Sequence, residues 1–134
     1  MITAKLNDYR QSPRKVRLVV NLIKGKKVED AKNILAFTVK RASKPILDLI
    51  DSAIANAKTN FSIEKENLFI KSITVNEGVV LKRRMPRARG MAYEIKKRNS
   101  HLFVELDTID NMPKTKKEIK KASEVKKVSK KVNK

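Results

Sequence analysis

The chain has 134 residues, of which 40% are hydrophobic and 35% are charged, and its formal net charge at pH 7 is +19. This size allows one domain with a modest core and an appendage, and the charge favours a phosphate-rich partner and resists self-assembly into a homo-oligomer. The chain has no cysteine, no apolar run long enough for membrane insertion and no secretory signal at its start, so a cytoplasmic protein is expected.

The N-terminal part of the chain predicts a strand followed by a helix. Residues 2–9 alternate weakly between apolar and polar positions, as a half-buried strand does. Ser12 and Pro13 form a favourable helix start, since serine can cap free amides and proline suits the first turn, and Gly25 supplies the stop. The predicted helix over 13–24 has a buried stripe of Val16, Val19, Val20 and Ile23.

Two more helices are predicted before the next strand. The second begins near Val28, with two acidic residues in its first turn, and its stripe is Ala31, Ile34, Leu35 and Thr38. The third is predicted from Ser43, as a cap, to Asn60. Its broad apolar face is expected at the centre of the core and comprises Ile46, Leu49, Ile50, Ala53, Ile54 and Ala57.

Strand patterns return at residues 68–75 and 101–109. The first is mixed, since its alternation places Phe69, Ile73 and Val75 on one side and Leu68 and Ile70 on the other. The second alternates cleanly, with Leu102, Val104 and Leu106 toward the core. We therefore expect an α+β fold in which three helices pack on one face of a small three-stranded antiparallel sheet, with a long protruding β-hairpin.

The segment between these strands, residues 77–98, carries eight lysines and arginines against two glutamates. Desolvating an unpaired charge costs several kcal/mol, so these side chains must face water or a polyanion. At roughly 3.3 Å per residue, a hairpin with Pro86 and Gly90 near its turn would extend about 35 Å beyond the core. We call this segment the arm.

Basic residues also surround the first predicted helix, with few acidic partners nearby. A solvated face is the plain alternative, but the missing partners favour phosphate contact. The candidate RNA-binding residues of both regions are Arg10, Arg14, Lys15, Arg17, Lys24, Lys26, Lys82, Arg83, Arg84, Arg87, Arg89, Lys96, Lys97 and Arg98.

One domain is expected over residues 1–110, arm included, followed by a lysine-rich tail over 111–134. The tail lacks the apolar content of a core, and we expect it to be disordered in isolation. Its lysines are mobile point charges, whereas the arginines of the arm can make bidentate contacts to phosphate, so loose neutralisation is expected of the tail and shape-fitted contact of the arm.

Residues for catalysis or metal binding do not occur in a usable pattern. His101 is the only histidine and has no catalytic or metal-binding partner at a useful spacing. Asp48 and Asp51 could form a metal-binding pair, but two acidic residues on a solvated helix face are the more frequent explanation of this spacing. The three glycines are isolated, which excludes a phosphate-cradling loop. We expect no enzyme activity, no cofactor and no metal.

Aromatic residues are few, which argues against a base-stacking platform of the RNA-recognition type. Tyr93, near the tip of the arm, is the one aromatic placed to stack on a base, and a packed or merely exposed side chain explains it equally well.

Several strings together resemble the bacterial family of large-subunit ribosomal protein twenty-two, a universal tunnel-lining family. They are SPRKVRLVVNLIKGK over 12–26, SAIANAKTN over 52–60, VNEG over 75–78 and LKRRMPRARGMAYEIKKRNSH over 81–101. The resemblance extends over about residues 3–108, and the MPRARG and KKRxSH strings are its most specific parts. The family commonly has a basic residue where this chain has Met91, and the tail after Asp110 goes beyond the usual family end.

The resemblance implies a domain on the outer surface of the large ribosomal subunit and an arm threaded inward through ribosomal RNA. It further implies neighbouring ribosomal proteins, the nascent peptide and macrolide antibiotics as partners at the tunnel, where the tip residues would be Met85, Pro86, Ala88, Gly90 and Met91. The function expected is that of a structural constituent that binds ribosomal RNA, supports subunit assembly and lines the peptide exit tunnel. From the residues alone the alternative is a DNA-compacting architectural protein with basic arms in the minor groove.

Overall fold

The structure is a computed structural model that describes residues 2–109, so the expected tail over 111–134 lies outside the described residues. The elements run β1 (Ile2–Tyr9), α1 (Pro13–Ile23), α2 (Val28–Phe37), α3 (Ser43–Phe61), η1 (Lys65–Asn67), β2 (Leu68–Pro86), η2 (Ala88–Gly90) and β3 (Ala92–Thr108). The α+β fold expected from the sequence is confirmed.

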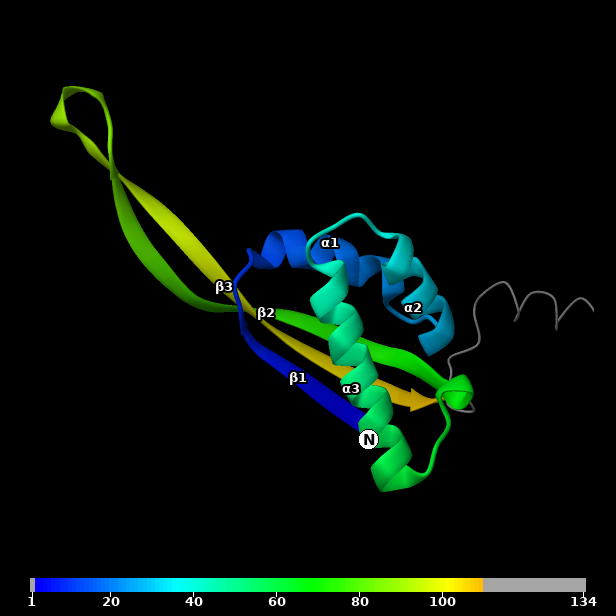
Figure 1. The fold of residues 1–134 in the computed structure, drawn as a ribbon. Coiled ribbons are helices and arrows are strands. Elements are labelled where there is room, and N and C mark those ends of the chain that lie inside the picture. Colours follow the sequence, from blue (N-terminus) through cyan, green and yellow to red (C-terminus); the bar gives the residue numbers. More distant parts are fainter. Residues whose placement is uncertain (1, 110–134) are drawn as a thin grey trace, which may run out of the picture.

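The sheet is antiparallel and has the strand order β1-β3-β2, so β3 is the central strand. Figure 1 shows the helices on one face of this sheet, while the far halves of β2 and β3 leave it together as the arm. The arm has two strands because β1 ends at Tyr9, which pairs with Ser100, and β3 continues toward the tip without it.

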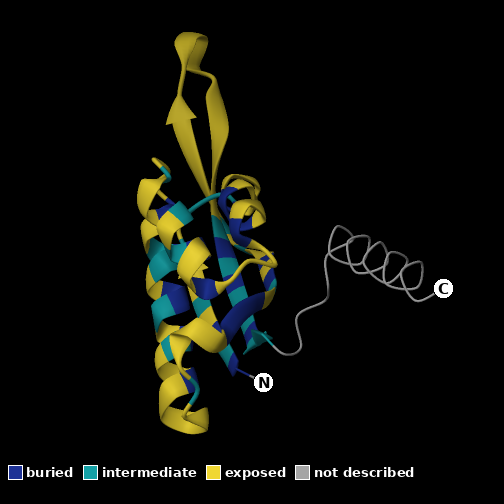
Figure 2. Cartoon of the chain, turned by 90° about the vertical axis from the view of Figure 1, so that its right-hand side faces the viewer, coloured by how far each residue is buried: buried dark blue, intermediate teal, exposed yellow. Residues whose placement is uncertain are grey.

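The core lies between the sheet and the helices, and Figure 2 shows buried residues there and an arm that is exposed along its length. Leu102, Val104 and Leu106 of β3 are each 0–1% exposed, as their alternation predicts. The four predicted stripe residues of α1 are also buried. Full burial of such an aliphatic side chain contributes about 1.5–3 kcal/mol, so the hydrophobic stabilisation is concentrated in this layer.

The mixed pattern of β2 is explained by a bulge. The pairing with β3 shifts between Ile70 and Ser72, so one extra residue, Lys71, is inserted and the side-chain alternation changes phase there. As a result Ile70 and Ile73 both belong to the core cluster, and their predicted placement on opposite sides was wrong. Phe69 is buried outside that cluster, where its backbone bridges to Lys27.

Two of the predicted helix caps differ from the structure. Ser12 is at the N-cap of α1, but its side chain makes no capping hydrogen bond. The N-cap of α3 is Ala42, and the hydroxyl of Ser43 instead donates to the carbonyl of Thr38 at 3.0 Å. Thr38 lies just past the end of α2, where its own hydroxyl donates to the Ile34 carbonyl at 2.6 Å.

The root of the arm is organised around His101. The backbone N–H of Asp8, a residue with a φ of 53°, donates to Nδ1 of His101 at 3.1 Å. On the other side of the ring is Gly78, where an added Cβ would lie only 2.8 Å from Nε2. The pairing of β2 and the pairing of β1 both shift beside this point, between Glu77 and Val80 and between Leu6 and Tyr9. Bulges increase strand twist and bend, so this contact sets where the arm departs from the sheet.

The close approach at the root predicts a coupled effect of two substitutions. Gly78→Ala should lower the free energy of unfolding by about 1–3 kcal/mol, because the new methyl group overlaps the imidazole. In a His101→Ala background the same change should cost much less, since the overlapping atoms are gone. Urea unfolding followed by circular dichroism measures both, and an equal cost in the two backgrounds would contradict the steric explanation.

The location of the core predicts that the domain folds without the arm. All buried hydrophobic side chains of residues 2–109 lie outside 77–99. Replacing Leu81–Lys96 by an Asn-Gly turn should therefore leave a cooperative thermal transition, because that turn suits a two-residue antiparallel hairpin. Loss of the transition in circular dichroism would show that the arm is part of the folding unit.

Candidate nucleic-acid interface

The arm presents its charge to solvent along its whole length. Every residue over 81–98 is exposed, including all eight predicted basic residues of that segment. Within residues 2–109 the arm contains one ion pair, in which Nζ of Lys96 is 3.9 Å from Oε1 of Glu94. The other cations of the arm are therefore available to an external anion.

The tip is a short closed loop. The N–H of Arg87 donates to the Met91 carbonyl at 2.7 Å, and the N–H of Met91 donates to the Ala88 carbonyl at 3.4 Å. Arg89 and Gly90 have φ values of 59° and 69°, a region that glycine adopts readily and arginine only at a cost of about 1–2 kcal/mol. The five predicted tip residues are all exposed on or beside this loop: Met85, Pro86, Ala88, Gly90 and Met91.

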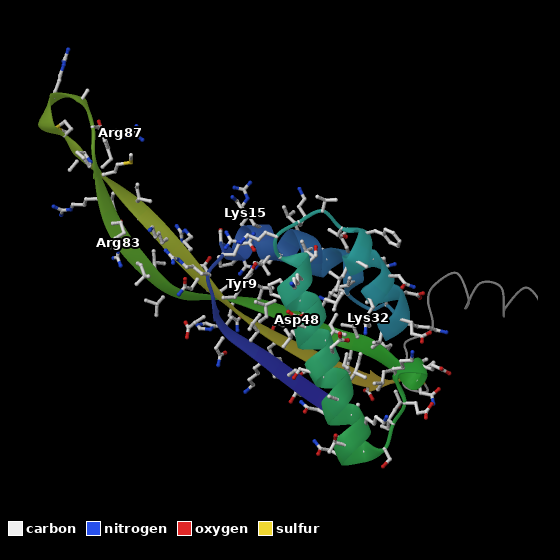
Figure 3. All side chains as sticks on the ribbon, viewed as in Figure 1. Tyr9, Lys15, Lys32, Asp48, Arg83 and Arg87 are labelled. Atoms are coloured by element: carbon white, nitrogen blue, oxygen red, sulfur yellow. The ribbon has the colours of Figure 1, made fainter. Side chains whose placement is uncertain are left out.

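At the root of the arm, segments distant in sequence line an open basic cavity of about 640 Å³. Six of its lining residues are cations, and two more are neutral and polar. We call this cavity the basic pocket, and its residues are Arg10, Gln11, Ser12, Lys15, Arg41, Lys96, Lys97 and Arg98. Figure 3 shows Lys15 on α1 above the strands where the arm leaves the sheet.

The electrostatics of the basic pocket favour an anion. None of the residues that line it is acidic, and six cations from the β1–α1 connection, α1, the turn before α3 and β3 line one cavity. Like charges at this density repel one another, and a polyanion removes the repulsion.

Tyr9 fixes two backbone segments beside the basic pocket. Its hydroxyl donates to Oε1 of Gln11 at 2.7 Å and is 3.4 Å from the carbonyl of Arg41. Burial raises the pKa of the Tyr9 hydroxyl above its ordinary value of 10.0, and the Arg41 cation opposes part of this rise. Tyr9 is therefore neutral at physiological pH and serves as a hydrogen-bonding support.

The structure brings five of the predicted RNA-binding residues together in the basic pocket, with a sixth cation that the sequence pattern did not indicate, Arg41. Arg41 lines the same pocket as the base of the arm because the α2–α3 connection lies near the root, a long-range placement that has no periodic signal in the sequence. The remaining predicted residues outside the pocket are exposed on the arm or on the surface of α1 and the turn after it.

Arg17 has a second, internal role. Its Nε and Nη2 both donate to the carbonyl of Val75, at 3.2 Å and 2.9 Å. Val75 is on β2, an edge strand of the sheet, so this guanidinium covers an edge carbonyl and ties α1 to the sheet. Its other N–H groups still face outward on an exposed residue.

The described part of the chain has few features that would support metal binding or a membrane span. Over residues 2–109 no group of three histidine, cysteine or acidic residues is arranged to hold a metal ion, and no helix is long and apolar enough to cross a membrane. Asp51 forms an ion pair with Lys32 at 2.7 Å. Asp48 lies on α3, as Figure 3 shows, and lines a surface pocket with Lys5 and Leu6 of β1.

Comparison with known proteins identifies relatives over most of the chain. The model of the family described as ribosomal protein L22p/L17e matches residues 4–107. A large ribosomal subunit protein uL22 from Acholeplasma laidlawii is 52% identical over 95 residues, which are 71% of this chain and 86% of the relative. A uL22 protein from Syntrophotalea carbinolica is 49% identical over 104 residues, 78% of this chain and 94% of the relative.

The internal hydrogen bonds of Arg17 distinguish it from its neighbour Arg14. Arg17→Ala should lower the free energy of unfolding by about 1–3 kcal/mol, since it leaves the Val75 carbonyl without this charged donor. Arg14→Ala, a change at an exposed arginine of the same helix, should change stability by less than about 0.5 kcal/mol. Urea unfolding of both variants measures the difference, and equal stabilities would show that the hydrogen bonds to Val75 contribute nothing.

Proposed function

The chain belongs to the ribosomal protein L22p/L17e family, and we propose that it binds ribosomal RNA through the arm and the basic pocket, supports assembly, and lines the nascent-peptide exit tunnel with the tip of the arm. Membership makes it a structural, non-enzymatic constituent of the large ribosomal subunit in the cytoplasm. The observation that carries the proposal is the basic pocket, in which six cations and no carboxylate meet at the root of an exposed arm.

The two basic regions suggest separate roles in RNA binding. The pocket is part of the folded domain, since residues of α1, of the turn before α3 and of β3 line it, and it would grip RNA backbone without a change of shape. The arm has no core of its own and would be surrounded by RNA, because its exposed arginines and lysines can contact phosphates on several sides. The pocket would thus position the domain, and the arm would reach into the subunit.

The tunnel role rests on the family and on the shape of the tip. The loop from Arg87 to Met91 is closed by its own backbone hydrogen bonds and contains the small residues Ala88 and Gly90. Small residues would leave room for a nascent peptide or a macrolide antibiotic, while the flanking arginines would contact RNA. Neighbouring ribosomal proteins would adjoin the tip and the domain in the assembled subunit.

The proposal predicts that neutral substitutions in the pocket weaken RNA binding. The double variant Arg41→Gln, Arg98→Gln should bind large-subunit ribosomal RNA with a salt slope reduced by about 1.4–1.8, because each lost phosphate contact removes about 0.7–0.9 from it. It should also be lost more readily from large subunits during a high-salt wash, as measured by co-sedimentation.

The control is Lys44→Gln, Lys58→Gln, which removes the same charge from exposed positions of α3 outside the basic pocket. Equal salt slopes for the two double variants would remove the pocket from the proposal. If the wild-type chain binds duplex DNA as tightly as ribosomal RNA and does not co-sediment with subunits, the DNA-compacting alternative is correct.

A further inference from the structure

The two faces of the arm differ in chemistry, and the strand register shows how. Residues directly opposite each other in an antiparallel pair share a face, and successive pairs alternate between faces. One face therefore contains the pairs Leu81 with Lys97, Arg83 with Ile95 and Met85 with Tyr93. The other contains the pairs Val80 with Arg98, Lys82 with Lys96, Arg84 with Glu94 and Pro86 with Ala92.

We call the face with Leu81, Arg83 and Met85 the mixed face, because each of its cross-strand pairs except Met85 with Tyr93 joins one apolar residue to one cation. Its four large apolar side chains are 36–59% exposed, and they are Leu81, Met85, Tyr93 and Ile95. The opposite, basic face has four cations and one glutamate, and its apolar residues are only Val80, Pro86 and Ala92. The paired part of the arm thus gathers its large apolar side chains on one side.

This arrangement leaves apolar surface in contact with water in the free protein and favours a partner that covers it. Each exposed apolar side chain leaves about 25 cal/mol per Å² of potential burial unused. The arm has no third strand or helix against this face, because every residue over 81–98 is exposed within the described part of the chain. The cations on the same face, Arg83 and Lys97, specify what the partner is.

A protein partner with an apolar surface would have to bury Arg83 and Lys97 along with the apolar groups, at the cost of desolvating two charges. RNA offers both kinds of contact in one chain, since an unpaired base has an apolar aromatic face and the linkage beside it has an anionic phosphate. The alternation of apolar and cationic residues therefore complements a single-stranded or looped RNA segment.

We propose that the mixed face binds unpaired bases of ribosomal RNA, with one base stacked on the ring of Tyr93. Met85 is directly opposite Tyr93, at a distance typical of cross-strand neighbours, and its flexible thioether can pack at the edge of the same base. Arg83 and Lys97 bind the adjoining phosphates. The basic face binds backbone only. This inference rests on the proposed binding of ribosomal RNA and adds the chemistry that one side of the arm recognises.

Salt dependence separates the two kinds of contact. Isolated large-subunit ribosomal RNA is titrated with the full chain at several salt concentrations. Tyr93→Ala should weaken binding by about 5- to 150-fold, the range of base–aromatic stacking, with an unchanged salt slope because no charge is lost. Tyr93→Phe should bind like the wild type, since the ring remains. Lys82→Gln, on the basic face, should reduce the slope by about 0.7–0.9.

A fluorescent reporter tests the contact directly. The chain has no tryptophan, so Tyr93→Trp introduces a single one. Its emission should be quenched by the RNA and then protected from acrylamide, as expected for a stacked indole. The matched control is Ala92→Trp, one residue away on the basic face, whose emission should not be quenched by stacking because that face contacts only the RNA backbone.

Three results would overturn the inference. Tyr93→Ala could bind like the wild type, or it could weaken binding only through a lower salt slope. It could also bind isolated RNA normally but fail to enter subunits, which would assign the mixed face to a protein neighbour. Failure of the proposed function would give a different result from failure of this inference, because the wild-type chain itself would then show no salt-dependent binding to this RNA. Thermal unfolding of every variant should match the wild type, since all of these positions are exposed.

Discussion

One continuous strand links the core to the arm, and the rest of the structure depends on it. β3 is the central strand of the sheet and also one limb of the arm, so a single alternation runs from Thr108 to Ala92. The even-numbered residues of β3, such as Leu102 and Val104, point into the core within the domain, and toward the tip the even-numbered residues form the basic face. The odd-numbered residues of β3 lie on the open face of the sheet within the domain, and toward the tip they form the mixed face. Packing in the domain therefore decides which chemistry each side of the arm presents.

Stability and function are separated along this strand. The domain end is held by aliphatic burial, because its inward side chains are 0–1% exposed. The arm end has backbone pairing but no buried side chains, and most of its charges are positive and repel one another until an anion neutralises them. The basic pocket is at the junction, where Lys96–Arg98 of the arm meet Arg10 and Arg41 of the domain. An anion bound there would reduce repulsion in both parts at once and fix their relative orientation.

Local patterns predicted the elements, and long-range packing produced what they missed. The alternation of Leu102, Val104 and Leu106 was a sufficient signal because one face of β3 is uniformly buried. The same reasoning failed in β2, because a bulge at Lys71 reverses which side chains point to the core, and the residue types give no sign of the bulge. Arg41 was missed for a related reason, because a connection between two helices has no period. The exposed arm was predicted correctly in outline, since charge alone excludes it from a core.

The string KKRNSH, over residues 96–101, shows how one compact motif divides into two physical roles. Its three cations line the basic pocket, as a purely electrostatic reading predicts. Ser100 is fully buried, with its hydroxyl 3.5 Å from the carbonyl of Tyr9, and His101 accepts the Asp8 N–H and closes against Gly78. These two residues bind the end of β1 and the bulge of β2, so they orient the strand that presents the cations. A substitution at His101 would therefore affect RNA contacts only through the direction of the arm, whereas one at Arg98 would act on the pocket itself.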